Sequence, residues 1–92
     1  MLNPDDPTLR TAVFGKQVEQ FMESDIGCYL TQCAEKDIEK GLAALRSADP
    51  FEPAKIVAAQ MKVKIAETVM GWLGDAIRAG LQATEAIKED VS

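Results

Sequence analysis

The stretch that decides the fold is PAKIVAAQMKVKIAETVMGWLGDAIRAGLQATEAIKE, residues 53–89. After its first residue it contains no proline, and apolar residues recur along it at three- and four-residue steps. That spacing places them on common faces of a helix, whereas a strand would alternate them between two sides. The sequence therefore predicts a single long helix over residues 53–89.

A seven-residue repeat runs along this long helix, and two of its positions hold apolar or small residues through five repeats. They hold Ile56, Val63, Met70, Ile77 and Thr84, and Ala59, Ala66, Leu73, Gly80 and Ile87. We call the residues at these two positions the seam. A seam of this kind indicates coiled-coil-like packing against a neighbouring helix. A further apolar line, flanked by Val69 and Leu81, lies on a different face and holds Ala58, Ile65, Trp72, Ala79 and Ala86. A helix with more than one apolar face must be covered on more than one side.

Two shorter helices are predicted before the long one, over residues 8–23 and 25–46. Asp6 or Thr8 can cap the first and Ser24 the second, because their side-chain oxygens accept hydrogen bonds from free N–H groups at a helix start. Each helix carries an apolar stripe that predicts its packing face. The stripes hold Leu9, Val13, Phe14, Val18, Phe21 and Met22, and Ile26, Tyr29, Leu30, Cys33, Ile38, Leu42 and Leu45.

Prolines mark a turn between the second helix and the long one. Asp49 followed by Glu52 resembles a capping box, so the long helix could begin at Pro50 or at Pro53. Residues 1–7 (MLNPDDP) are expected to be an extended segment. They are acidic and proline-rich, whereas a secretory signal has a basic start and an apolar run.

The helix lengths suggest how the three helices are arranged. At 1.5 Å per residue they measure about 24, 33 and 54 Å, so the first two, end to end, match the third. Only Ser24 and Asp25 join the first two, which is short for a reversal between packed helices. We therefore favour an all-α, elongated helical hairpin, with two N-terminal helices packed on one long C-terminal helix in one domain, residues 1–92. The alternative is a compact three-helix bundle in which the first helix folds back.

Composition excludes several classes of function. Hydrophobic residues make up 47% of the 92 residues and charged residues 27%, which is typical of a globular chain. The net charge of −5 argues against nucleic-acid binding, which relies on lysine and arginine. There is no histidine, the commonest general base and metal ligand. Glu67, Asp75 and Arg78 interrupt the longest apolar region, so no membrane span is expected. The chain is predicted not to be an enzyme, with no catalytic residue, metal or cofactor.

The two cysteines are predicted neither to bridge each other nor to bind zinc. Cys28 and Cys33 are five residues apart, which puts them about 140° apart around a helix, too far to bridge. The chain lacks the further thiolates or imidazoles that a zinc site needs. We therefore interpret both as small, partly buried thiols in a reducing compartment.

Glycines and one tryptophan suggest close contacts on the long helix. Gly71, Gly74 and Gly80 could allow another helix or a ligand to approach, or could kink the helix, or could simply be tolerated. Trp72 is either a core residue or an interface anchor. Lys55, Lys62 and Lys64 lie in a stretch without acids and form a solvated face or meet an acidic partner. The predicted interface residues are Ile56, Val63, Ile65, Met70, Gly71, Trp72, Leu73, Gly74, Ile77, Gly80 and Leu81.

The chain also resembles a known group of proteins. The block Thr11–Leu30 (TAVFGKQVEQFMESDIGCYL), the acidic helix after it, the Asp49–Pro50 turn and Ala66–Leu73 (AETVMGWL) resemble short helical proteins encoded by tailed bacteriophages and prophages. The resemblance implies a phage protein that acts in the bacterial host cytoplasm or in the virion. It carries over no activity and no site residues.

Three functions are compatible with these observations. The first is a non-catalytic, oligomerising phage protein that acts through protein–protein contacts as a virion or assembly accessory. The second is an inhibitor of a host protein, for anti-defence or host takeover. The third is a binder of a small ligand, such as a nucleotide, at an oligomer interface. The expected partners are thus the chain itself, or another phage or host protein, and neither nucleic acid nor a membrane.

Overall fold

The computed structural model describes residues 5–91, which form three helices and no strand. The helices are α1 (Pro7–Glu23), α2 (Asp25–Ser47) and α3 (Pro53–Val91). Each predicted boundary lies within two residues of the observed one. Most of the predicted extended segment, residues 1–4, lies outside the described residues. The all-α fold class is confirmed.

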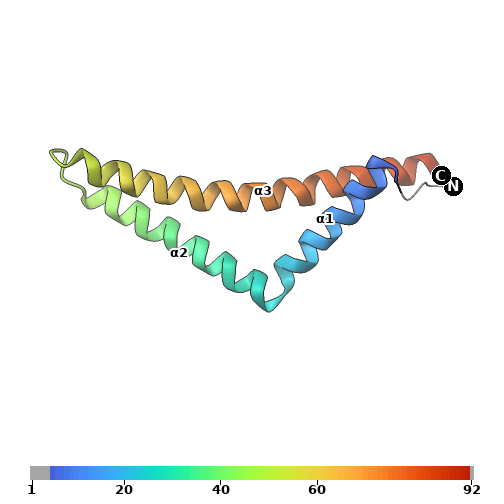
Figure 1. The fold of residues 1–92 in the computed structure, drawn as a ribbon, viewed down its shortest axis with the longest axis horizontal. Coiled ribbons are helices and arrows are strands. Elements are labelled where there is room, and N and C mark those ends of the chain that lie inside the picture. Colours follow the sequence, from blue (N-terminus) through green and yellow to red (C-terminus); the bar gives the residue numbers. More distant parts are fainter. Residues whose placement is uncertain (1–4, 92) are drawn as a thin grey trace.

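The three helices form an elongated hairpin. Figure 1 shows α3 running the length of the molecule, with α1 and α2 as a bent arm along it. The bend points away from the middle of α3, while the start of α1 and the end of α2 lie alongside its two ends. The molecule measures 63 × 25 × 20 Å. The preferred arrangement is confirmed, and the compact three-helix bundle is not what the chain forms.

Ser24 joins α1 to α2 without a loop. Its backbone N–H donates to the carbonyls of Gln20 and Phe21, which closes α1. Its hydroxyl donates to the Phe21 carbonyl at 2.5 Å and accepts from the Gly27 N–H at 3.1 Å, which opens α2. One serine therefore caps both helices, because its extended backbone interrupts the helix for a single residue. At the other end of α1, the Asp6 carboxylate accepts from the Thr8 N–H at 2.8 Å, so Asp6 is the cap there.

The capping box predicted before α3 does not form. The Asp49 carboxylate accepts from the Phe51 N–H at 2.9 Å, and the Glu52 N–H donates to the Asp49 carbonyl. Asp49 therefore stabilises the turn itself. The Glu52 carbonyl accepts from the N–H groups of Lys55 and Ile56, so α3 begins at Pro53 and not at Pro50.

Small residues make up the core. The buried apolar side chains of the described residues are Val18, Ala59, Val63, Ala66 and Ala83. Both heptad positions predicted on α3 are buried or half-buried along their whole length, so the predicted seam is confirmed. Four glycines are also buried, namely Gly15, Gly27, Gly41 and Gly80. The helices therefore pack close to one another through small side chains.

Backbone meets backbone where α1 crosses α3. A Cβ atom added to Gly15 would lie 2.6 Å from the Cα of Gly80, and one added to Gly80 would lie 2.7 Å from the Cα of Gly15. On α2, a Cβ at Gly41 would collide with a methyl group of Val63. Glycine is required at positions 15 and 80, because no other residue permits so close an approach of two backbones.

The stripes predicted on α1 and α2 are only partly covered, which corrects their expected role. On α1 only Val18 of the stripe is buried, and Val13, Phe14 and Phe21 are exposed. On α2 the exposed members are Ile26, Tyr29, Leu30 and Leu42. The reason is that Gly15 of α1 and Gly41 of α2 face α3, so the side chains on the other sides of these helices stay exposed.

Candidate functional site

The molecule exposes more surface than a compact chain of its size. A folded monomer of 10.0 kDa exposes about 5,200 Å², whereas this chain exposes 7055 Å². Its radius of gyration is 18.6 Å, against about 12 Å for a compact domain of this length. Fourteen large apolar side chains in the described part of the chain are exposed.

All but one of the predicted interface residues of α3 fall into two sets. One set belongs to the seam that α1 and α2 cover, and it contains Ile56, Val63, Met70, Leu73, Ile77 and Gly80. These residues are buried or half-buried, and Val63 and Gly80 lie directly against Gly41 of α2 and Gly15 of α1. The other set is exposed and contains Ile65, Gly71, Trp72 and Leu81. Gly74 is half-buried, with the end of the Arg78 side chain nearest to it.

An uncovered apolar face follows α3 on the side away from the seam. We call it the α3 outer face, and it holds Ala58, Met61, Ile65, Val69, Trp72 and Ala79. Met61 is 57% exposed, Ile65 61% and Trp72 66%. A shallow hollow of about 260 Å³ lies at its centre, lined by Lys64, Ile65, Thr68, Val69 and Trp72. The face includes four residues of the further apolar line predicted from the sequence. Trp72 is not a core residue, and its role as an interface anchor stays a prediction.

Sequence reasoning missed apolar surface outside α3. Phe14 is 57% exposed and Phe51 90%. Phe14 lines a second hollow of about 300 Å³, together with Leu9, Arg10, Val13 and Gln17. The signal that could have found this surface is Gly15, since the side of α1 that carries a required glycine faces α3 and the Phe14 side does not.

The predicted glycine-lined face is not a continuous surface. Gly80 is buried against Gly15, whereas nothing lies within 4 Å of a Cβ added to Gly71. α3 also continues through Gly71 and Gly74 without interruption. The close approach predicted along three glycines is therefore found at Gly80 alone, where α1 is the neighbour.

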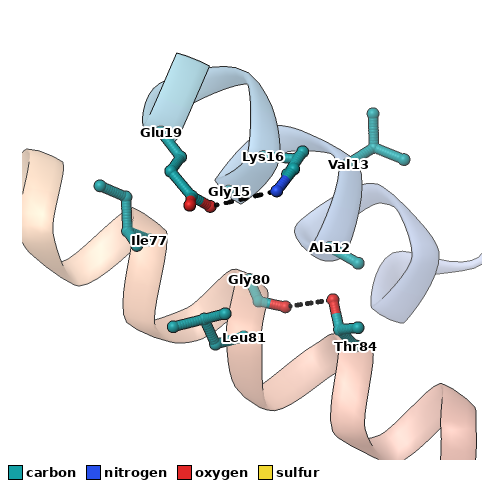
Figure 2. Close-up of a pocket in the computed structure, with 9 residues that line it drawn as sticks. All are labelled: Ala12, Val13, Gly15, Lys16, Glu19, Ile77, Gly80, Leu81 and Thr84. Carbon is teal, nitrogen blue, oxygen red and sulfur yellow. Dashed lines mark hydrogen bonds and ion pairs between the residues drawn. The ribbon is translucent and has the colours of Figure 1, made fainter. Parts of the chain in front are cut away.

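A groove of about 340 Å³ lies beside the Gly15–Gly80 crossing (Figure 2). Its charged side chains are Lys16 and Glu19, which pair with each other at 3.7 Å and are both exposed. The Thr84 hydroxyl donates to the Gly80 carbonyl at 2.9 Å. The polar groups of the groove thus interact with one another, and the rest of its lining is apolar or glycine.

Charged groups lie at the surface in the described part of the chain, where no polar or charged residue is buried. Lys55 pairs with Glu52 at 2.6 Å, and Lys62 of α3 pairs with Asp37 of α2 at 3.8 Å. Two of the three lysines considered for an acidic partner thus contact acids of their own chain. Such exposed pairs contribute little to stability.

The described residues contain neither a metal-binding group nor a disulfide. No group of three or more cysteine, aspartate or glutamate residues is arranged to hold a metal ion there. Cys28 is exposed and Cys33 half-buried, and both are free thiols. The Cys28 thiol donates to the Met22 carbonyl at 3.6 Å, at the α1–α2 bend.

Within residues 5–91, no helix combines the length and apolar character needed to cross a membrane.

Comparisons with protein-family models, curated proteins and solved structures found no match for this chain.

Proposed function

We propose that this chain is a non-enzymatic helical protein that self-associates and acts through protein–protein contacts, as a virion or assembly accessory of a tailed phage. The observation that carries the proposal is the α3 outer face, with Ile65 61% and Trp72 66% exposed on a rigid helix. Contiguous exposed apolar surface is typical of interaction sites. Tryptophan is also enriched among the residues that dominate binding energy.

The remaining surface supports a role without catalysis. A catalytic site usually gathers titratable groups in a cleft, where burial and neighbouring charges tune them. Here the groove at the Gly15–Gly80 crossing holds an exposed ion pair, Lys16–Glu19, and otherwise apolar lining. The chain also contains no histidine.

The phage setting is supported by the sequence resemblance of Thr11–Leu30 and Ala66–Leu73. It is tested by producing the chain with two different tags in the cells that naturally make it, and capturing one tag. We expect the other tagged copy and structural proteins of the phage particle to be recovered together. Purified particles should contain the chain, or should fail to form when its gene is deleted.

Two results would contradict this proposal. Recovery of one host enzyme in stoichiometric amount, without the second tagged copy, would favour an inhibitor of a host protein. Normal particles that lack the chain and form without it would remove the assembly role.

A further inference from the structure

We propose that the α3 outer face binds the same face of a second copy, with the two α3 helices antiparallel. This inference rests on the proposed self-association and specifies its surface and orientation. The face extends from Ala58 to Ala79, about 32 Å along the helix. Its midpoint falls between Thr68 and Val69, and Ile65 and Trp72 lie at equal distances on either side of it.

The exposed area supports a second copy as the occupant. The chain exposes 7055 Å², about 1,800 Å² more than a compact monomer of its mass. Each partner in a standard interface contributes about 800 Å², and permanent homodimers use more. The surplus, summed over all three helices, exceeds the area that one partner of a standard interface contributes. A copy of the chain also brings an apolar face of equal length, as a two-fold interface requires.

The face is suited to a helix of the same kind. The hollow of about 260 Å³ beside Trp72 lies at the centre of the face, so a two-fold axis near the midpoint places the partner's central side chains over it. Its lining is apolar except for Lys64 and Thr68 at its border. Packing there would cover Ile65 and Trp72, which are 61% and 66% exposed.

Charge within the face favours one of the two orientations. Lys62 and Lys64 lie before its midpoint and Asp75 after it. In an antiparallel pair centred between Thr68 and Val69, Lys62 of one copy lies level with Asp75 of the other, whereas a parallel pair places each lysine beside the same lysine of the partner. The helix dipoles favour the antiparallel orientation as well.

The first test measures which face is used. Trp72→Glu should raise the dimer dissociation constant about 30-fold or more, the effect of losing a central anchor, in sedimentation equilibrium. Phe51→Glu is the matched control, because Phe51 is 90% exposed in the turn before α3 and lies off the outer face. Equal dissociation constants for Trp72→Glu and the wild type would overturn the proposal while leaving self-association intact.

The second test measures orientation by thiol cross-linking of the full chain in a Cys28→Ser, Cys33→Ser background. With a short bis-maleimide, Thr68→Cys should cross-link to itself. Ala58→Cys and Ala79→Cys should each fail alone and should cross-link when mixed. Self-cross-linking of both Ala58→Cys and Ala79→Cys would show parallel helices. The absence of any cross-link from Thr68→Cys in a chain that sediments as a dimer would show that another face is used. A wild-type chain that sediments only as a monomer would overturn the proposed function together with this inference.

Discussion

Gly15 and Gly80 meet at the point where α1 crosses α3, and each leaves no room for a Cβ on the other. Gly71 belongs to the same helix as Gly80, yet the space around it is open. The same residue type is therefore required at one position and only tolerated at the other. In a helix interior, a tolerated glycine lowers stability by about 0.5–1 kcal/mol relative to alanine.

Alanine at these two positions should act in opposite directions. Gly80→Ala should lower the free energy of unfolding by about 1–3 kcal/mol, because the crossing must open to admit a methyl group. Gly71→Ala should raise it by about 0.5–1 kcal/mol through helix propensity. Urea denaturation at one protein concentration measures both. If Gly80→Ala proved as stable as the wild type, the close crossing would be wrong.

Both cysteines should be replaceable. Cys28 is exposed and Cys33 half-buried, and neither forms a disulfide. Cys28→Ser keeps a donor near the Met22 carbonyl, so we expect a change of at most about 0.5 kcal/mol for either Cys28→Ser or Cys33→Ser. Thermal unfolding followed by circular dichroism measures this. A larger loss in the double variant would mean that a thiol has a structural role beyond its own size.

At the scale of helices, Ser24 sets the bend of the arm. Its hydroxyl is the N-cap of α2 and also contacts the last turn of α1. Ser24→Ala should lower stability by about 1 kcal/mol, the usual cost of a lost N-cap. Ser47→Ala, at the other end of α2, is the control, because the Ser47 hydroxyl only donates to carbonyls of its own exposed last turn. Equal stability of the two variants would argue that the cap does not hold the junction.

The sequence predicted the elements well, because its signals for them are local. Proline at positions 7 and 53, the serine at 24 and the heptad seam of α3 are properties of neighbouring residues, and the structure agrees with each. Local signals could not predict which side of α1 and which side of α2 would pack against α3. The stripe containing Phe14 is more hydrophobic than the face containing Gly15, yet close backbone approach places the glycine face against α3.

The candidate site was predicted only in part for the same reason. The heptad pattern identified two apolar faces of α3. It could not show which of the two faces α1 and α2 would cover and which would stay exposed. That assignment depends on where Gly41 and Gly15 contact α3, which is a long-range property of the chain. As a result, predicted interface residues such as Val63 and Gly80 pack within the chain, while Trp72 is exposed.

At the scale of the whole molecule, a rod of 63 × 25 × 20 Å is too thin to enclose its large side chains. Side chains larger than alanine in the buried core of the described residues are Val18 and Val63. A chain of this size gains little stability from so small a core. We therefore expect its stability to depend on association with other copies, so the midpoint of thermal unfolding should rise with protein concentration. Differential scanning calorimetry over a hundredfold concentration range measures this, and a constant midpoint would contradict it.

The most direct measurement of the central claim is the mass of the folded chain in solution. Sedimentation equilibrium across the micromolar range should give a mass of at least twice 10.0 kDa, with full helical content at the same concentrations. A folded, helical species of 10.0 kDa throughout that range would show that the uncovered apolar faces need no second copy, and would contradict the account.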